Sequence, residues 1–205
     1  MKLQVSYNCS NLAQALTIAE QTADYADILG VGSLLLFKEG VRAVKTFKAT
    51  FPNKDIAVEA RITEKADIAI KMMASEGARY ITVLAGSYST TITKAVAAAQ
   101  ESDTKIVLDL LDAQSLGQSA LDAKTLGIHS LILYRHNHTS EFTELDAEWH
   151  SVRENTQLPI FIAGKIDETN IQHIIALKPH GIIIGTHIMK ADNPAKAAQY
   201  FKSLM

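Results

Sequence analysis

Two apolar runs near the end of the chain, PIFIA at residues 159–163 and GIIIG at residues 181–185, decide the fold class. Both are short, aliphatic and uninterrupted by polar residues, which is typical of strands covered on both faces of a parallel sheet. Six similar runs precede them, at residues 3–7, 27–31, 56–61, 80–84, 105–110 and 130–135. Segments with helical spacing separate the runs, so the chain repeats a βα unit of roughly 25 residues.

About eight such units without a change of composition predict a single (β/α)8 barrel of the TIM type, one domain over residues 1–205. The alternative is an open doubly wound sheet. No G-x-G-x-x-G motif follows the first strand run, so we expect no nucleotide cofactor. At the helix ends, Asn11 is placed to cap the first helix, Thr63 to cap the helix after the third strand, and Pro194 to begin the last helix.

Composition narrows the class of protein. The 205 residues are 47% hydrophobic but only 6% aromatic, so the core must consist mainly of small and aliphatic side chains. A net charge of −2 without a run of like charges gives no reason to expect a nucleic-acid partner. The single cysteine, Cys9, cannot form an internal disulfide, and no stretch resembles a signal peptide or a membrane span. We therefore expect a soluble cytoplasmic protein with no membrane partner.

Functional side chains of such a barrel lie at the C-terminal ends of strands and in the loops that follow. Asn8 and Asp109 end the first and fifth strand runs, and Glu59 and Arg61 end the third, with Glu64 shortly after. Residues two apart in a strand point the same way, so Glu59 and Arg61 should both face the barrel interior. A charged pair there is costly unless it is paired or functional, and we favour function over a structural ion pair.

The last two strand runs predict a phosphate site. Gly164-Lys165 follows the seventh run, and Gly185-Thr186-His187 follows the eighth. The loops at these two places, together with a nearby helix N-terminus, often bind phosphate in (β/α)8 barrels. Glycine lets backbone N–H groups approach an anion, and Lys165 adds a positive charge.

Arg135 and His136 follow the sixth strand run, and His138 lies two residues further on. Polar density after an apolar strand suits substrate contact by Arg135 and proton transfer by His136, because histidine titrates near neutral pH. The His-x-His spacing invites zinc, but no further Cys or His at ligand spacing completes a site. We interpret the histidines on helices or at strand entries as structural: His129, His150, His173 and His180.

At these residues the chain resembles a known family, that of 3-hexulose-6-phosphate synthase and 3-keto-L-gulonate-6-phosphate decarboxylase in the orotidine-5′-phosphate decarboxylase superfamily. The likeness covers essentially the whole chain. It is carried by MKLQVSYN at residues 1–8, GSLLLFKEGVRAVKTFKATFP at 32–52, YITVLAG at 80–86, IVLDLLDA at 106–113, PIFIAGKID at 159–167 and GIIIGTHIMKADNPAKAA at 181–198. The resemblance implies a (β/α)8 barrel that acts on a sugar phosphate.

The family signature on the third strand, Asp-x-Lys-x-x-Asp, is Glu59-x-Arg61-x-x-Glu64 in this chain. The sign of each charge is kept, but an arginine that stays protonated cannot replace a lysine that shuttles a proton. The resemblance gives Glu59 the role of metal or hydroxyl ligand and Arg61 that of enolate stabiliser. In family dimers the second acidic residue completes the neighbouring subunit's site, so the resemblance implies a homodimer with Glu64 in that role.

Other positions also depart from the family pattern. Asn8 replaces Asp and Gly30 replaces a magnesium-holding Glu, while in the phosphate loops Lys165 replaces Gly and Thr186 replaces Arg or Gly. The family's catalytic histidine is displaced to His136. Magnesium is the cofactor that the resemblance implies, and of its protein ligands only Glu59 is kept, with Asp109 as a second carboxylate in reach.

The leading hypothesis is therefore a diverged carbon–carbon lyase of the aldehyde-lyase or carboxy-lyase type, acting on a phosphorylated ketose. Two alternatives remain at this point. One is a catalytically silent barrel that only binds a phosphorylated metabolite. The other is a metal-independent sugar-phosphate isomerase or epimerase, which requires paired acid and base groups across the barrel mouth.

Overall fold

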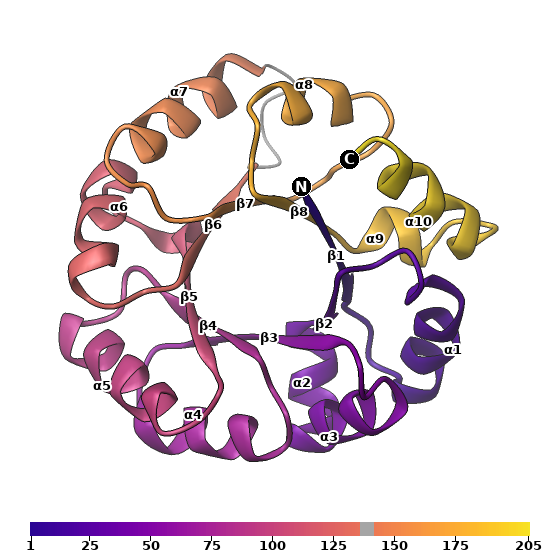
Figure 1. Ribbon diagram of the computed structural model, residues 1–205, viewed down its shortest axis with the longest axis horizontal. Helices are drawn as coiled ribbons and strands as arrows, with labels where there is room; N and C mark the ends of the chain where they lie inside the picture. Colours follow the sequence, from indigo (N-terminus) through magenta and orange to yellow (C-terminus); the bar gives the residue numbers. More distant parts are fainter. Residues whose placement is uncertain (136–141) are drawn as a thin grey trace.

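Residues 1–135 and 142–205 are described by a computed structural model of the chain. Eight parallel strands pair in chain order and β1 closes on β8, so the predicted (β/α)8 barrel is confirmed (Figure 1). The strands are β1 (Lys2–Tyr7), β2 (Ile28–Val31), β3 (Asp55–Ile62), β4 (Tyr80–Leu84), β5 (Lys105–Asp109), β6 (Ser130–Tyr134), β7 (Ile160–Ala163) and β8 (Gly181–Ile184).

Helices form a ring outside the strands (Figure 1). The α-helices are α1 (Leu12–Thr22), α2 (Ser33–Glu39), α3 (Val41–Thr50), α4 (Ala66–Ser75), α5 (Ser89–Gln100), α6 (Leu116–Thr125), α7 (Phe142–Arg153), α8 (Ile171–Ala176), α9 (Thr186–Met189) and α10 (Pro194–Ser203). A 3-10 turn, η1 (Leu110–Asp112), follows β5. In the part of the chain that is described, no helix has the length and apolar character needed to cross a membrane.

The predicted helix ends are right in two cases and wrong in one. Asn11 caps α1 by accepting a hydrogen bond from the backbone N–H of Gln14, and Pro194 begins α10. Thr63 does not cap α4. That helix starts after Lys65, whose φ of 48° is left-handed, so the chain turns once more before the helix can begin.

Strand alternation divides the core into two parts. On β8, Ile182 and Ile184 point outward into the large core between strands and helices, whereas Ile183 points into the barrel. The interior core is small and consists of Ile28, Ala57, Val107, Ile132, Phe161, Ala163 and Ile183, with Tyr80 and Tyr134 against it. These few side chains fill only the middle of the barrel, and polar side chains line both ends.

Candidate active site

A pocket of about 380 Å³ opens at the C-terminal end of the barrel, and we call it the C-terminal pocket. Most predicted site residues line it: Asn8, Glu59, Arg61, Gly164, Lys165, Gly185, Thr186 and His187. They come from the ends of β1, β3, β7 and β8 and from the following loops. Glu59 and Arg61 share this pocket, as expected from their spacing along β3.

The backbone of β3 is irregular where it carries Arg61. Its register with β4 shifts between Val58 and Ile62, and Arg61 has a left-handed φ of 48°. The backbone N–H of Arg61 leaves the strand ladder and donates to Thr82 Oγ1 at 2.8 Å. A left-handed conformation is unfavourable for a residue with a Cβ atom and persists only where surrounding contacts hold it, as at many functional sites.

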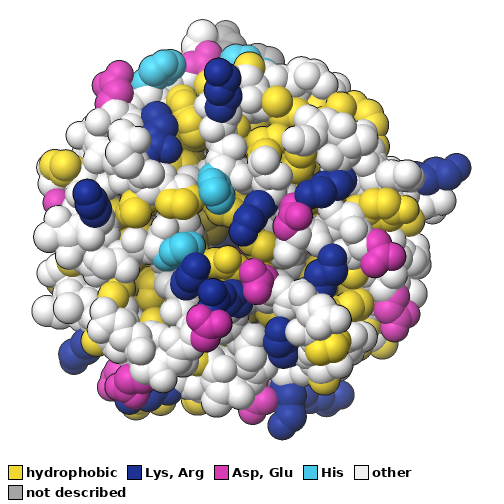
Figure 2. All heavy atoms as spheres, viewed as in Figure 1, with side chains coloured by type: hydrophobic (Ala, Val, Ile, Leu, Met, Phe, Trp, Pro, Cys, Tyr) yellow, Lys and Arg dark blue, Asp and Glu magenta, His cyan; other side chains and the backbone are white. Residues whose placement is uncertain are grey.

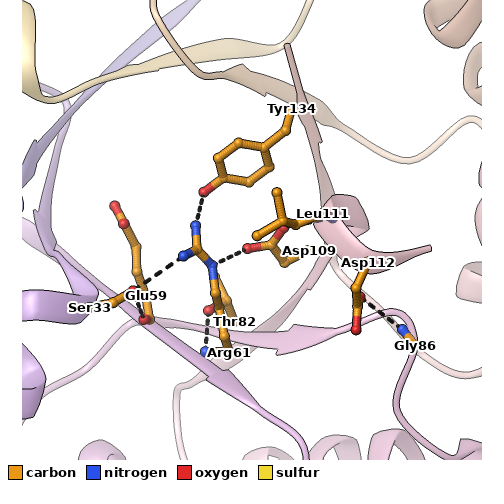
Figure 3. A network of polar contacts seen from close by, with 9 residues as sticks. All are labelled: Ser33, Glu59, Arg61, Thr82, Gly86, Asp109, Leu111, Asp112 and Tyr134. Atoms are coloured by element: carbon orange, nitrogen blue, oxygen red, sulfur yellow. Dashed lines mark hydrogen bonds and ion pairs between the residues drawn. The ribbon is translucent and has the colours of Figure 1, made fainter. Parts of the chain in front are cut away.

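The Arg61 guanidinium connects three neighbouring elements (Figure 3). Nε donates to Asp109 Oδ2 at 2.9 Å, Nη2 donates to the Tyr134 hydroxyl, and Nη1 makes a long contact of 3.5 Å with Ser33 Oγ. The guanidinium carbon, Cζ, also lies 5.2 Å from the centre of the Tyr134 ring. Arginine has five N–H donors, so two remain for a ligand. Arg61 is thus a fixed cation at the pocket wall.

Asp109 supports Arg61 from beneath. Its side chain is 1% exposed and also accepts a hydrogen bond from the backbone N–H of Leu111 at 3.1 Å. Burial raises the pKa of Asp109, and the Arg61 guanidinium lowers it by less. Burial alone would lower the pKa of Arg61, but Tyr134 and Asp109 together raise it above its ordinary value. The pair therefore stays together and Arg61 stays protonated.

Glu59 is the group whose bonding is incomplete. Its side chain points into the barrel (Figure 3), is buried, and among the described residues its Oε1 atom has no hydrogen-bond partner. Burial raises the pKa of Glu59, and a hydrogen bond with the Ser6 side chain and the nearby Arg61 charge only partly offset this. A buried carboxyl oxygen without a partner is expensive, which makes Glu59 the strongest sign of a ligand site.

Asn8 and Gly30 lie beside this group. Asn8 Oδ1 accepts a hydrogen bond from the backbone N–H of Leu34 at 2.9 Å, in the first turn of α2. A Cβ atom at Gly30 would lie 3.1 Å from Gln4 Nε2 and 3.3 Å from Glu59 Oε1. A longer side chain at position 30 would thus crowd Glu59, and a carboxylate would also repel it.

The loop after β7 is shaped by its backbone. Gly164 has φ 93°, and a Cβ atom there would lie 2.6 Å from the carbonyl oxygen of Arg135, so only glycine fits. The carbonyl oxygen of Lys165 accepts from Arg135 Nη1 at 3.2 Å and from Asn170 Nδ2 at 2.9 Å. Arg135 therefore holds the loop, and the exposed Lys165 side chain forms no ion pair within the described residues.

The loop after β8 closes the same side of the pocket. Gly185 precedes α9, and a Cβ atom there would lie 3.1 Å from the carbonyl oxygen of Ser6. Thr186 is exposed at the pocket mouth. His187 is engaged with Glu168, with Nε2 and Oε2 2.8 Å apart, and this contact lowers the pKa of Glu168. The negative charge of Glu168 therefore lies beside the loops that are predicted to bind phosphate.

One predicted residue stands apart from this geometry. Glu64 is exposed in the loop between β3 and α4 and does not line the C-terminal pocket. His136 lies outside the described residues.

Several residues contribute to the site without having been singled out from the sequence: Ser6, Ser33, Tyr134 and Asn170. Tyr134 ends a strand run directly before Arg135, which was a usable signal. Ser6 lies two residues before Asn8 and so shares its face of β1. Ser33 and Asn170 act through hydrogen bonds to the backbones of Glu59 and Lys165, for which the sequence has no pattern.

Comparison with known proteins adds the family. 3-Hexulose-6-phosphate synthase of Bacillus subtilis is 26% identical over 210 residues, a match that covers 100% of this chain and 99% of that protein. The protein of the same name from Staphylococcus aureus is 27% identical over 207 residues, covering 97% and 96% of the two chains.

Solved structures agree with this relationship. The structure of 3-hexulose-6-phosphate synthase from Salmonella typhimurium superposes with a TM-score of 0.92 at 25% identity, over 100% of this chain and 98% of that one. That of 3-keto-L-gulonate-6-phosphate decarboxylase from Vibrio cholerae superposes with a TM-score of 0.84 at 25% identity, over 99% and 97% of the chains. The sequence profile described as "Orotidine 5'-phosphate decarboxylase / HUMPS family" matches residues 1–201, and the chain therefore belongs to that family.

Proposed function

We propose that this protein is a carbon–carbon lyase that acts on a phosphorylated ketose in the C-terminal pocket. Support comes from relatives named 3-hexulose-6-phosphate synthase and from the pocket's position at the strand ends where barrel enzymes carry their sites. The observation that carries the proposal is the buried Oε1 of Glu59, which has no hydrogen-bond partner among residues 1–135 and 142–205, in a side chain that lines one pocket with Arg61. A hydroxyl or carbonyl group of a sugar would satisfy both.

The phosphate group of the substrate is assigned to the loops after β7 and β8. Gly164 and Gly185 both line the pocket, and their lack of a Cβ atom exposes neighbouring backbone N–H groups. Lys165 contributes a positive charge on an exposed side chain. The carboxylate of Glu168, which pairs with His187 beside these loops, disfavours a ligand with a second anionic group. A single phosphate group is therefore the expected anion.

The proposed chemistry is the making or breaking of a carbon–carbon bond next to the ketone. When that bond breaks, its electron pair moves toward the carbonyl, and an enediolate oxygen gains negative charge. Arg61 donates hydrogen bonds to that oxygen, which is strong stabilisation in a partly buried site. The other fragment leaves as carbon dioxide, or as an aldehyde whose hydroxyl proton passes to solvent. Because burial raises its pKa, Glu59 keeps a proton at a higher pH than an ordinary carboxyl group and donates it to the enediolate carbon, after which solvent protonates Glu59 again.

The donor atoms do not fit the magnesium ion that the family resemblance implies. Within residues 1–135 and 142–205, no three His, Cys, Asp or Glu side chains are grouped in a way that could hold a metal. Magnesium prefers carboxylate oxygens, and Asp109 already bonds Arg61, whose charge repels a cation. Of the carboxylates that the family resemblance places near the metal, Glu59 alone is left as a ligand in the part of the chain that the structure describes, so we assign no catalytic step to a metal.

A homodimer is part of the proposal. Glu64 is exposed on a loop from which α4 extends, and α4 presents Ile68 and Met72 with 59% and 51% exposure. Phe37 of α2 is 77% exposed. Large apolar side chains of this kind mark protein interfaces when they gather on one surface. In a dimer Glu64 would enter the partner's site, and sedimentation equilibrium at micromolar concentration tests the dimer directly.

Turnover of both family substrates tests the proposal. We expect weak condensation of ribulose 5-phosphate with formaldehyde, or weak decarboxylation of 3-keto-L-gulonate 6-phosphate, equal with and without magnesium. Glu59→Gln should remove this activity, because it removes the proton donor while keeping the shape. Binding of ribulose 5-phosphate, followed by thermal shift, should persist in this variant. At a hundredfold excess over the dissociation constant a ligand stabilises by about 2.7 kcal/mol.

The matched control is Asp112→Asn, since Asp112 bonds the backbone N–H of Gly86 at 3.0 Å and lies outside the C-terminal pocket. This variant should keep the wild-type rate. Binding without any turnover would overturn the lyase and favour a silent metabolite-binding barrel. Interconversion of pentose phosphates without bond cleavage would favour the isomerase alternative. Robust magnesium-dependent turnover would show that the substituted residues still perform the family's metal chemistry.

A further inference from the structure

A second cavity opens at the opposite, N-terminal end of the barrel, and we call it the N-terminal cavity. It holds about 30 Å³ of space, with an apolar floor that includes Ile28, Val107 and Phe161. Figure 2 views this end of the molecule, where histidine, lysine or arginine, and acidic side chains surround a hollow with apolar atoms at its base. Such a volume holds two or so water molecules or one small group, since a water needs roughly 10–15 Å³ on this measure.

Three basic side chains line this cavity: Lys2, His129 and His180. Their backbones belong to the ordered sheet, because His129 N donates to Ile106 O at 2.9 Å, and Lys2 N donates to His180 O at 2.9 Å. Each imidazole also packs on an aromatic ring of the barrel interior. His129 lies 5.9 Å from Tyr80, and His180 lies 5.8 Å from Phe161, between ring centres. The two imidazoles are therefore held at the cavity, and the backbone of Lys2 is fixed beside them.

The charges around the cavity are predominantly positive. Burial, followed by Lys105, Arg79, Lys2 and His180, lowers the pKa of His129. Burial, Lys2 and the amino terminus lower the pKa of His180. Neither imidazole makes a hydrogen bond within the described part of the chain.

Two of the nearby acidic groups are already paired with cations. Asp103 pairs with Arg79, and Asp27 pairs with Lys202 at 2.6 Å. Asp55 lies 3.5 Å from the Tyr80 hydroxyl, and neither histidine has its pKa affected by Asp55. The two histidines thus face cations without a matching anion, an arrangement that favours binding of negative charge.

We propose that the N-terminal cavity is a second binding site, for the phosphate dianion, held by Lys2, His129 and His180. The three donors enter from the starts of β1, β6 and β8 and can each bond a different oxygen of a tetrahedral anion. The small volume excludes a sugar and takes only part of a phosphate group, so the anion sits at the cavity mouth with its oxygens toward the three side chains, either as inorganic phosphate or as the end of a phosphate ester. The proposal is independent of the reaction assigned to the C-terminal pocket.

Histidine NMR on the full chain tests this site. The probe is inorganic phosphate, titrated at constant ionic strength against a chloride reference. We expect saturable shifts of the His129 and His180 imidazole signals and titration of both at higher pH when phosphate is bound, since the anion stabilises their charged forms. His150 on α7 and His173 on α8 serve as internal controls and should not move. Lys2→Gln should weaken the binding roughly fivefold, the size of one exposed charge contact.

Ribose 5-phosphate, titrated in parallel, distinguishes the two sources of phosphate. Equal shifts at His129 and His180 assign the site to any phosphate end group, and shifts with inorganic phosphate alone assign it to the free ion. Phosphate shifts confined to His187 and the Gly164 and Gly185 amides would place all binding in the C-terminal pocket and overturn the proposal. Equal effects of phosphate and chloride, or unchanged affinity in Lys2→Gln, would also overturn it.

Discussion

The two ends of the barrel are built from the same strands but handle charge in opposite ways. At the C-terminal end the cation, Arg61, is bonded to Asp109 and Tyr134, and the carboxyl group of Glu59 is left without a partner at Oε1 among the described residues. At the N-terminal end Asp103 and Asp27 are paired with cations, and the two cavity histidines have no hydrogen-bond partner in the same part of the chain. One end therefore offers a buried acid beside a fixed cation, and the other offers basic donors.

Strand β1 shows how one element serves both ends. Lys2 and Gln4 line the N-terminal cavity, while Ser6 and Asn8 line the C-terminal pocket. Alternate residues of a strand point to the same side, so this row of four polar side chains runs along the barrel interior. Barrel interiors are usually filled with branched apolar residues. Both ends of β1 are thus polar, and the difference in charge between the two ends of the barrel comes from the side chains that the other strands place beside β1.

The largest effect is expected from Arg61→Met, which breaks the best-bonded cation of the C-terminal end. Asp109, with 1% exposure, would lose its partner. We expect a loss of about 3 kcal/mol in the free energy of unfolding, because removing one member of a buried pair leaves an uncompensated charge. Urea denaturation measures it. The control is Arg42→Met, whose side chain is 75% exposed and whose contact with Glu39 is 3.9 Å long, and it should change stability by less than about 0.5 kcal/mol. Equal effects of the two variants would show that the Arg61–Asp109 pair is not buried.

The next effect concerns Glu59 and the pH dependence of stability. Its folded-state pKa is raised above the ordinary 4.5, so its contribution is fully present below pH 4.5 and is lost as pH rises through the folded-state pKa. A pKa that is higher by one in the folded state than in the unfolded state changes the free energy of unfolding by about 1.4 kcal/mol. Glu59→Gln should remove this decline, as seen from unfolding measured between pH 4 and 8. An identical pH profile in wild type and variant would mean that a partner already compensates the carboxylate.

The smallest effect is expected at the N-terminal end, with the opposite sign. Burial and neighbouring cations lower the pKa of His129 and His180 below the ordinary 6.5. Stability from these groups is present above pH 6.5 and is lost as pH falls through the folded-state values. In the double variant His129→Gln, His180→Gln, the loss of unfolding free energy toward low pH should be smaller than in the wild type. The difference should be less than about 0.5 kcal/mol, because solvent screens exposed groups. A steeper decline toward low pH in the double variant would contradict the assignment.

The sequence by itself determined the barrel, since each strand run and each helical segment is encoded by local spacing. PIFIA and GIIIG became β7 and β8, and the period of two placed Glu59 and Arg61 in one pocket. The strand and spacing inferences succeeded because they depend on residues a few positions apart. The rule that sites lie after strands pointed to the loops around Gly164 and Gly185, and their binding of phosphate stays a prediction.

The tertiary structure alone decided which side chains contact one another in the two sites. Arg61, Asp109 and Tyr134 come from β3, β5 and β6, and no local pattern says that they meet. The start of α4 depends on a left-handed Lys65, so Thr63 was a wrong cap. His129 and His180, interpreted from the sequence as structural, face one cavity only because closure of the barrel brings the starts of β6 and β8 together around its axis. Distance along a chain sets local conformation, whereas charge and burial depend on neighbours that only the closed sheet supplies.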